Sequence, residues 1–61
     1  MGFNKARDKN GQWIKVGDTV LLWFSNKTAK VKAVRAFGNI ELELTEPPWR
    51  MGGKAWKVEK L

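Results

Sequence analysis

The feature that most constrains this sequence is a turn followed at once by its most apolar run. Gly17-Asp18 has turn chemistry, because glycine tolerates positive φ and aspartate can bond its own backbone two residues on. Residues 19–24 are β-branched, aromatic or leucine, which favours a strand. Alternate residues share a face: Val20, Leu22 and Phe24 on one side, Thr19, Leu21 and Trp23 on the other. A strand that is apolar on both faces is expected to be central, or to carry a binding surface on its second face.

Length and composition bound the kind of protein. A chain of 61 residues forms one small domain, which buries only about 60% of its unfolded surface. Cysteine and histidine are both absent, which excludes disulfides and the usual zinc ligand sets. No apolar run approaches the roughly 20 residues of a membrane span, and the polar N-terminal residues lack the apolar core of a signal peptide. We therefore expect a cytoplasmic protein with no metal, no cofactor and no membrane association.

A second regular feature is a predicted hairpin over residues 28–44. Residues 28–36 alternate apolar and basic side chains, but the phase slips once, which predicts a β-bulge at Ala33-Val34. Phe37-Gly38-Asn39 has the residues of a short hairpin loop, and residues 39–44 then alternate cleanly. The expected pairs are Ala36 with Ile40, Arg35 with Glu41, Val34 with Leu42, Lys32 with Glu43 and Val31 with Leu44. In this register apolar residues meet apolar ones and each charge meets its opposite.

The two ends of the chain are less regular. Residues 1–11 are polar and basic without periodicity, so we expect a flexible basic N-terminal arm, with a disordered tail as the alternative. Residues 12–16 follow as an extended lead-in. Near the C-terminus, residues 54–61 resume alternation as a last strand. We expect that strand to direct Trp56 and Val58 into the core and Leu61 to close it.

The segment between these strands contains Pro47-Pro48, which cannot donate to a sheet ladder. Residues 45–53 are therefore excluded from a central strand and are expected to form a loop. Gly52-Gly53 is interpreted as a further turn within it.

The opening Val16-Gly17-Asp18-Thr19-Val20 resembles the V-G-D-x-V start of many SH3-like small barrels. These include KOW-type and Tudor-like modules and the C-terminal DNA-binding domains of retroviral-type integrases. The resemblance covers about residues 14–61 and concerns architecture. It implies an all-β fold: an SH3-like barrel of about five short antiparallel strands over residues 12–61, with the arm over residues 1–11.

Catalysis is not expected. The chain has no histidine, cysteine or tyrosine, which removes the commonest general bases and nucleophiles. No phosphate-cradling glycine-rich motif of the P-loop kind is present. We therefore predict a non-catalytic binding protein.

The charge favours an anionic partner. Twelve lysines and arginines against six acids give a net charge of +6, and the isoelectric point is about 10.1. Both chain ends are basic, whereas residues 39–46 are acidic. If the ends approach each other, they form one positive surface containing Trp13, Trp49 and Arg50. We predict that the ligand is nucleic acid or another polyphosphate, bound by phosphate contacts and by stacking on exposed tryptophans.

Nine residues are candidates for this site: Lys5, Arg7, Trp13, Lys15, Trp23, Lys30, Lys32, Trp49 and Arg50. Trp23 forms a stacking platform beside Lys30 and Lys32, or else packs against the arm or a second subunit. Trp49 stacks on a ligand from its loop, or else folds back to plug the barrel end.

The alternative function is a protein-interaction module, in which the aromatic side chains form a peptide groove or a face for a homodimer. Phe37, at a hairpin tip, is then either solvent-exposed or part of an interface. Small size, basic charge and many tryptophans also fit a phage or bacterial factor that captures a host protein or a signalling nucleotide.

Overall fold

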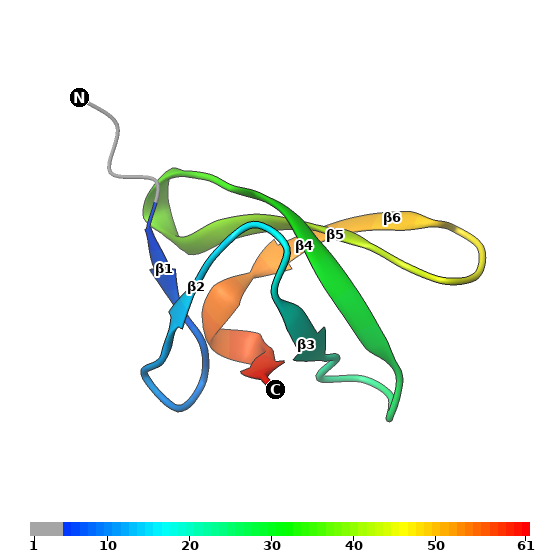
Figure 1. The fold of residues 1–61 in the computed structure, drawn as a ribbon, viewed down its shortest axis with the longest axis horizontal. Coiled ribbons are helices and arrows are strands. Elements are labelled where there is room, and N and C mark those ends of the chain that lie inside the picture. Colours follow the sequence, from blue (N-terminus) through cyan, green and yellow to red (C-terminus); the bar gives the residue numbers. More distant parts are fainter. Residues whose placement is uncertain (1–4) are drawn as a thin grey trace.

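The computed structural model describes residues 5–61. Their regular structure consists of β-strands and two single turns of 3-10 helix (Figure 1). A small antiparallel sheet pairs β1 (Ala6–Arg7) with β2 (Trp13–Ile14). The remaining elements are β3 (Thr19–Leu21), β4 (Thr28–Val34), η1 (Ala36–Gly38), β5 (Asn39–Glu43), β6 (Arg50–Lys54), η2 (Ala55–Lys57) and β7 (Glu59–Lys60). Five strands form one antiparallel sheet in the order β6-β5-β4-β3-β7. The all-β prediction is confirmed, but no ladder joins β6 to β7 in the described chain, so the sheet is not a closed barrel.

β3 is an interior strand, as its apolar sequence predicts. It pairs with β4 on one side and with β7 on the other, and Val20 and Leu22 are buried. The strand ends at Leu21 rather than at Phe24, because the Leu22 N–H donates to the Lys27 carbonyl at 3.0 Å and closes a turn. Phe24 therefore lies in that turn and is exposed, which corrects its expected place on one strand face with Val20 and Leu22.

The β4–β5 hairpin forms with a bulge, but its register differs from the prediction. The extra residue is Lys32, between Val31 and Ala33, and Val34 rather than Ala36 lies opposite Ile40. The cause is the turn, which begins one residue early: the Arg35 N–H donates to the Asn39 carbonyl at 2.7 Å around η1. The pairing therefore shifts by two residues, and because facing alternates with period two, the apolar side chains stay together.

The ion pairs expected in this hairpin still form, on diagonals of the new register. Arg35 Nε lies 2.5 Å from a carboxylate oxygen of Glu41, and Lys32 Nζ lies 3.9 Å from Glu43. Long basic side chains reach diagonal neighbours across a strand pair, so these contacts do not report the register uniquely.

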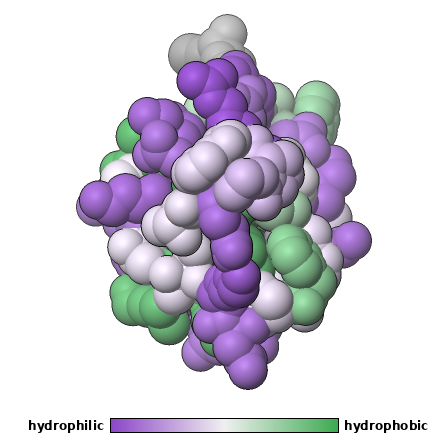
Figure 2. Space-filling view, turned by 90° about the vertical axis from the view of Figure 1, so that its right-hand side faces the viewer, coloured by the Kyte–Doolittle hydropathy of each residue, from purple (hydrophilic) through white to green (hydrophobic). Residues whose placement is uncertain are grey.

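β6 is an edge strand where a loop was expected. The two glycines lie in extended backbone rather than in a turn, since neither has positive φ. Gly53 meets a close approach instead: a Cβ atom there would lie 2.8 Å from Cη2 of Trp23. The β5–β6 connection forms one end of the long axis of the molecule (Figure 1). Figure 2 shows that end, where hydrophobic side chains form separate patches among hydrophilic ones.

The core lies on one face of the main sheet, and its largest fully buried side chains are Ile40, Leu42, Val20, Val31 and Val58. Before β7 the chain makes η2 rather than a continuous strand. Residues three apart share a side of a 3-10 helix, so Ala55 and Val58 are buried together and Trp56 is not. Trp56 is 54% exposed and Leu61 65% exposed, which corrects the expectation that both enter the core.

The N-terminal segment is folded from Ala6 onward, which corrects the expected arm for residues 6–11. Ala6 and Ile14 pair across the β1–β2 hairpin and are both buried. The Lys9 N–H donates to the Val58 carbonyl at 3.0 Å, which ties the hairpin to the C-terminal segment. Residues 1–4 of the predicted arm lie outside the described residues.

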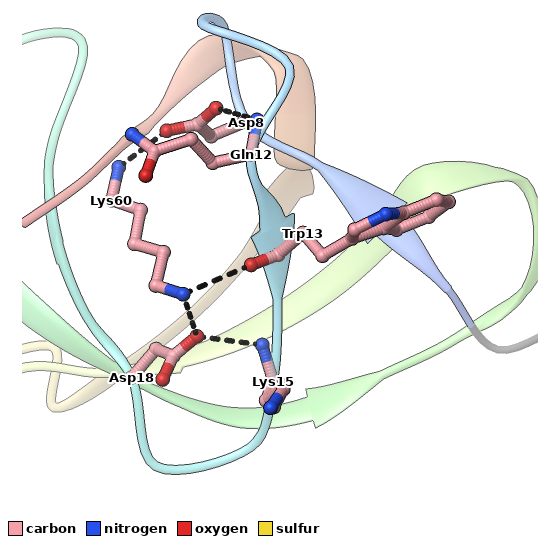
Figure 3. Close-up of polar contacts among 6 residues, drawn as sticks. All are labelled: Asp8, Gln12, Trp13, Lys15, Asp18 and Lys60. Atoms are coloured by element: carbon pink, nitrogen blue, oxygen red, sulfur yellow. Dashed lines mark hydrogen bonds and ion pairs between the residues drawn. The ribbon is translucent and has the colours of Figure 1, made fainter.

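A buried carboxylate holds this hairpin on the sheet (Figure 3). Asp8 is only 3% exposed. One of its oxygens accepts the N–H groups of Asn10 and Gln12 at 2.9 and 2.8 Å, and the other accepts the Lys60 N–H at 2.8 Å. The Lys60 ammonium continues the network, since it contacts the Trp13 carbonyl at 3.2 Å and an Asp18 oxygen at 3.6 Å. The first and last strands are thereby joined through side chains.

The pKa of Asp8 is set by opposing effects. Burial raises it, whereas the three backbone N–H donors and the nearby Lys60 charge lower it, and the net pKa lies below the ordinary 3.8. A carboxyl whose pKa is lower in the folded state stabilises the fold above the unfolded pKa. That stabilisation is lost as pH falls below 3.8 toward the lower folded value.

Asp8→Asn should therefore lower the free energy of unfolding near neutral pH by about 1–3 kcal/mol, because a weaker acceptor faces the same buried donors. The difference from the original protein should shrink as pH falls below 3.8. Urea unfolding followed by circular dichroism at several pH values measures both effects. Asp18→Asn is the matched control, and because Asp18 is more exposed and receives a single backbone N–H, a smaller loss is expected. If the difference in free energy of unfolding between Asp8→Asn and the original protein stayed constant down to acid pH, the lowered pKa of Asp8 would be contradicted.

Candidate functional site

The acidic side chains are all engaged within the described chain, and this decides where the positive charge lies. Asp8 accepts backbone N–H groups, and the other five acids form ion pairs: Lys9–Glu59, Lys27–Glu46, Lys32–Glu43, Arg35–Glu41 and Lys60–Asp18. Seven of the twelve cations have no acidic partner among the described residues: Lys5, Arg7, Lys15, Lys30, Arg50, Lys54 and Lys57. The excess charge of the protein is carried by this set.

Four of these seven cations lie over tryptophan rings. The Arg7 guanidinium is 4.2 Å from the centroid of the Trp13 ring, and Lys5 Nζ is 5.8 Å from it. Lys54 Nζ is 5.5 Å from the Trp56 ring, and Lys57 Nζ is 5.6 Å from the Trp23 ring. These distances are within reach of cation–π attraction. Three half-exposed aromatic rings thus sit in locally positive surroundings.

The Trp13 surface, which we define as Lys5, Arg7, Trp13 and Lys15, is the densest of these groups. Arg7 and Trp13 are direct partners in the β1–β2 ladder, so their side chains leave the hairpin on the same side. The Trp13 indole points away from Asp18 and Lys60 (Figure 3) and is 48% exposed. Lys5, Trp13 and Lys15 also line a groove of about 560 Å³, with Val16 and Val34 supplying apolar wall. The structure therefore brings four of the nine candidate residues together.

Trp23 has surroundings that differ from the predicted platform. Its ring lies against Gly53 on the side of the sheet that carries Ile40, because Gly53 and Ile40 are direct ladder partners. Lys30 pairs with Glu43 and lies on the opposite side, since neighbours alternate. Trp23 is the least exposed of the four tryptophans and also contacts Phe24 edge to face at 5.1 Å. Its packing is within the chain, against β6, rather than beside Lys30 and Lys32.

The remaining candidates lie elsewhere on the molecule. Trp49 is exposed in the β5–β6 connection, at the opposite end of the long axis from the β1–β2 hairpin (Figure 1), and it does not plug the core. Arg50 begins β6 and borders a groove of about 590 Å³ with Lys32 and Arg35. The single positive surface expected to contain Trp13, Trp49 and Arg50 does not form.

Sequence reasoning missed two parts of this arrangement. Asp8 lies in a segment without periodicity and was not singled out, although Asp8-x-Asn10-Gly11 has the composition of an aspartate-bonded turn. Trp56 was assigned to the core by a strand period of two. The small Ala55 three residues before Val58 is the signal of a 3-10 turn that could have placed it outside.

The described residues contain no group of three or more histidine, cysteine, aspartate or glutamate side chains that could hold a metal ion. None of the described helices is long and apolar enough to cross a membrane.

Comparison with known proteins finds no protein-family model, no curated protein and no solved structure that matches this chain.

The two adjacent glycines of β6 offer a test of the Trp23 placement. A Cβ at Gly53 would lie 2.8 Å from Trp23 Cη2, whereas at Gly52 the nearest atom would be the Ile40 carbonyl oxygen at 3.8 Å. We expect Gly53→Ala to displace the Trp23 ring and to cost about 1–3 kcal/mol of stability, as overpacking does. Gly52→Ala is the matched control and should leave the ring in place.

The indole N–H resonances in a two-dimensional NMR spectrum would report the displacement, with Trp23→Phe identifying the Trp23 signal. A Trp23 signal that moves equally in both alanine variants would contradict the packing described above.

Proposed function

We propose that this protein is a non-catalytic module that binds single-stranded nucleic acid at the Trp13 surface. The observation that carries the proposal is the location of unpaired charge: Lys5 and Arg7 have no acidic partner among the described residues and lie over a half-exposed tryptophan ring. An exposed ring offers a base a face to stack on, while unpaired cations beside it attract the phosphates that follow. Lys15 lines the same groove and adds a third cation to it.

The charge distribution supports a polyanion over a neutral ligand. Each acid in the strands of the main sheet (Glu41, Glu43 and Glu59) forms an ion pair with a lysine or arginine, so these acids neutralise charge near themselves and leave the Trp13 surface positive. Contacts between these cations and the phosphates of a nucleic acid carry no sequence information. Residues 5–61 contain no α-helix that could enter a major groove, so we propose binding without sequence-specific readout.

We further propose that the fold is of the SH3-like small-barrel type. The V-G-D-x-V opening supports this, as do the five-strand order β6-β5-β4-β3-β7 and the 3-10 turn directly before the last strand. The proposed function does not depend on this assignment, because one architecture hosts unrelated activities. We also propose a cytoplasmic location, because a small domain without cysteine needs no oxidising compartment to form disulfides.

A second candidate function is peptide binding, and one groove favours it. The β3–β4 and β5–β6 connections enclose about 380 Å³ between apolar residues that include Phe24, Leu44, Pro47 and Met51. The Lys27–Glu46 ion pair joins the same two connections. Proline and aromatic side chains along a groove suit an extended peptide.

Salt dependence separates the two functions. We expect a short oligothymidylate to quench tryptophan fluorescence, with an affinity that falls steeply between about 50 and 200 mM salt as counterions return to the phosphates. Trp13→Ala should weaken binding by about 1–3 kcal/mol, the loss of one stacked base. Arg7→Gln should weaken it and lower the salt slope by about one.

Lys27→Gln is the charge-matched control, because it removes one cation from the other end of the molecule and should leave the affinity nearly unchanged. Phe24→Leu controls for the loss of an exposed ring. Absence of quenching at low salt, or an affinity independent of salt, would reject nucleic-acid binding and favour a peptide ligand.

A further inference from the structure

An aromatic residue is displayed at the tip of the β4–β5 turn in an unfavourable backbone conformation. Phe37 is 87% exposed, and its φ of 63° and ψ of 28° place it in the left-handed region. That region favours glycine or asparagine and disfavours bulky side chains. Core packing does not explain this phenylalanine, because the ring is in solvent. Strain of this kind is found where a side chain is presented for binding.

A second ring and an unpaired cation lie against the same turn. A Cβ atom at Gly38 would lie 2.6 Å from Cζ3 of Trp56, so the Trp56 ring rests directly on η1, against the residue that follows Phe37. Lys54 Nζ lies 5.5 Å from the Trp56 ring and has no acidic partner among the described residues. Its ammonium instead donates to the Asn39 side-chain oxygen at 2.6 Å, which holds it at this turn. Phe37, Lys54 and Trp56 together form what we call the η1–η2 station.

The η1–η2 station is next to the Trp13 surface. Cα atoms of β1 come within 8 Å of Cα atoms in both η1 and η2. β1 is also the direct ladder partner of β2, which carries Trp13, and paired strands are about 5 Å apart. β1, which carries Arg7, therefore lies close to both groups of aromatic residues.

We propose that the η1–η2 station is a second base-stacking site, so that a single strand bound at Trp13 continues across β1 and stacks further bases on Phe37 and Trp56. This inference rests on the proposed function and adds the ligand class: a strand of several nucleotides rather than a mononucleotide. Arg7 and Lys54 contact the phosphates between and beside the stacked bases. The exposed, left-handed Phe37 is explained as a ring retained for stacking.

Phe37→Gly tests the inference, because it removes the ring while glycine suits the left-handed backbone. Thymidine monophosphate and an oligothymidylate of about eight nucleotides serve as the two probes, with binding followed by shifts of the Trp13 and Trp56 indole N–H resonances. We expect the variant to bind the oligonucleotide about tenfold more weakly, as the loss of one stacked base implies. Its affinity for the mononucleotide should not change, and its thermal midpoint should stay equal or rise.

Phe37→Asn is the second variant, because asparagine also tolerates this conformation and any loss of binding it shares with Phe37→Gly cannot come from glycine flexibility. Phe24→Leu removes an exposed ring outside the station and is the control. Oligonucleotide affinity equal to that of the original protein in both Phe37 variants would overturn the inference, as would an equal loss for both probes. In those cases the original protein still binds, so the proposed function stands. If the original protein binds neither probe, the proposed function itself fails.

Discussion

The contact on which most of this small fold depends is the buried carboxylate of Asp8. Its oxygens accept N–H groups from the β1–β2 hairpin and from β7, which are at opposite ends of the sequence. A buried carboxylate without such donors would be costly, and buried N–H groups without an acceptor would be costly as well. In this structure the buried carboxylate of Asp8 accepts these buried N–H groups, so neither cost arises. The hairpin is thereby fixed to the sheet although β1 and β2 have only two residues each.

Because the hairpin is fixed, its outer side becomes a rigid surface rather than a mobile tail. Lys60 bonds Asp8 through its backbone and reaches Asp18 and the Trp13 carbonyl through its side chain, so Asp18 and Asp8 are both occupied beneath the hairpin. Trp13, Arg7 and Lys5 then project from the other side, where no acid is described. The acids of the main sheet are engaged in the same way, because Glu41 and Glu43 each form an ion pair with a basic side chain. Positive charge accumulates beside tryptophans because the acids are used elsewhere.

Glycine positions show how backbone and aromatic rings constrain each other. Gly53 gives room to Trp23, and Gly38 gives room to Trp56, each by lacking the one atom that would collide. The sequence showed these glycines only as turn signals, because a close approach by a ring from a distant segment leaves no local trace. For the same reason Trp56 and Trp23 were assigned to wrong neighbours by period-two alternation, whereas the turn after β3 and the 3-10 turn before β7 change that period.

What the sequence determined by itself was set by local chemistry. Residues 19–21, 28–34 and 39–43 form strands because their side chains suit a pleated surface with one buried face. The hairpin keeps its apolar side chains on that face because the extra residue of the bulge restores their phase. The net positive charge and the absence of histidine and cysteine follow from composition. Tertiary structure decided what depends on contacts between distant segments: that residues 6–11 fold onto the sheet, that Asp8 is buried, and that Trp13 shares its surface with Lys5 and Arg7 rather than with Trp49. Those outcomes follow from which hydrogen-bond donors and which rings meet in space, and no periodicity along the chain records such meetings.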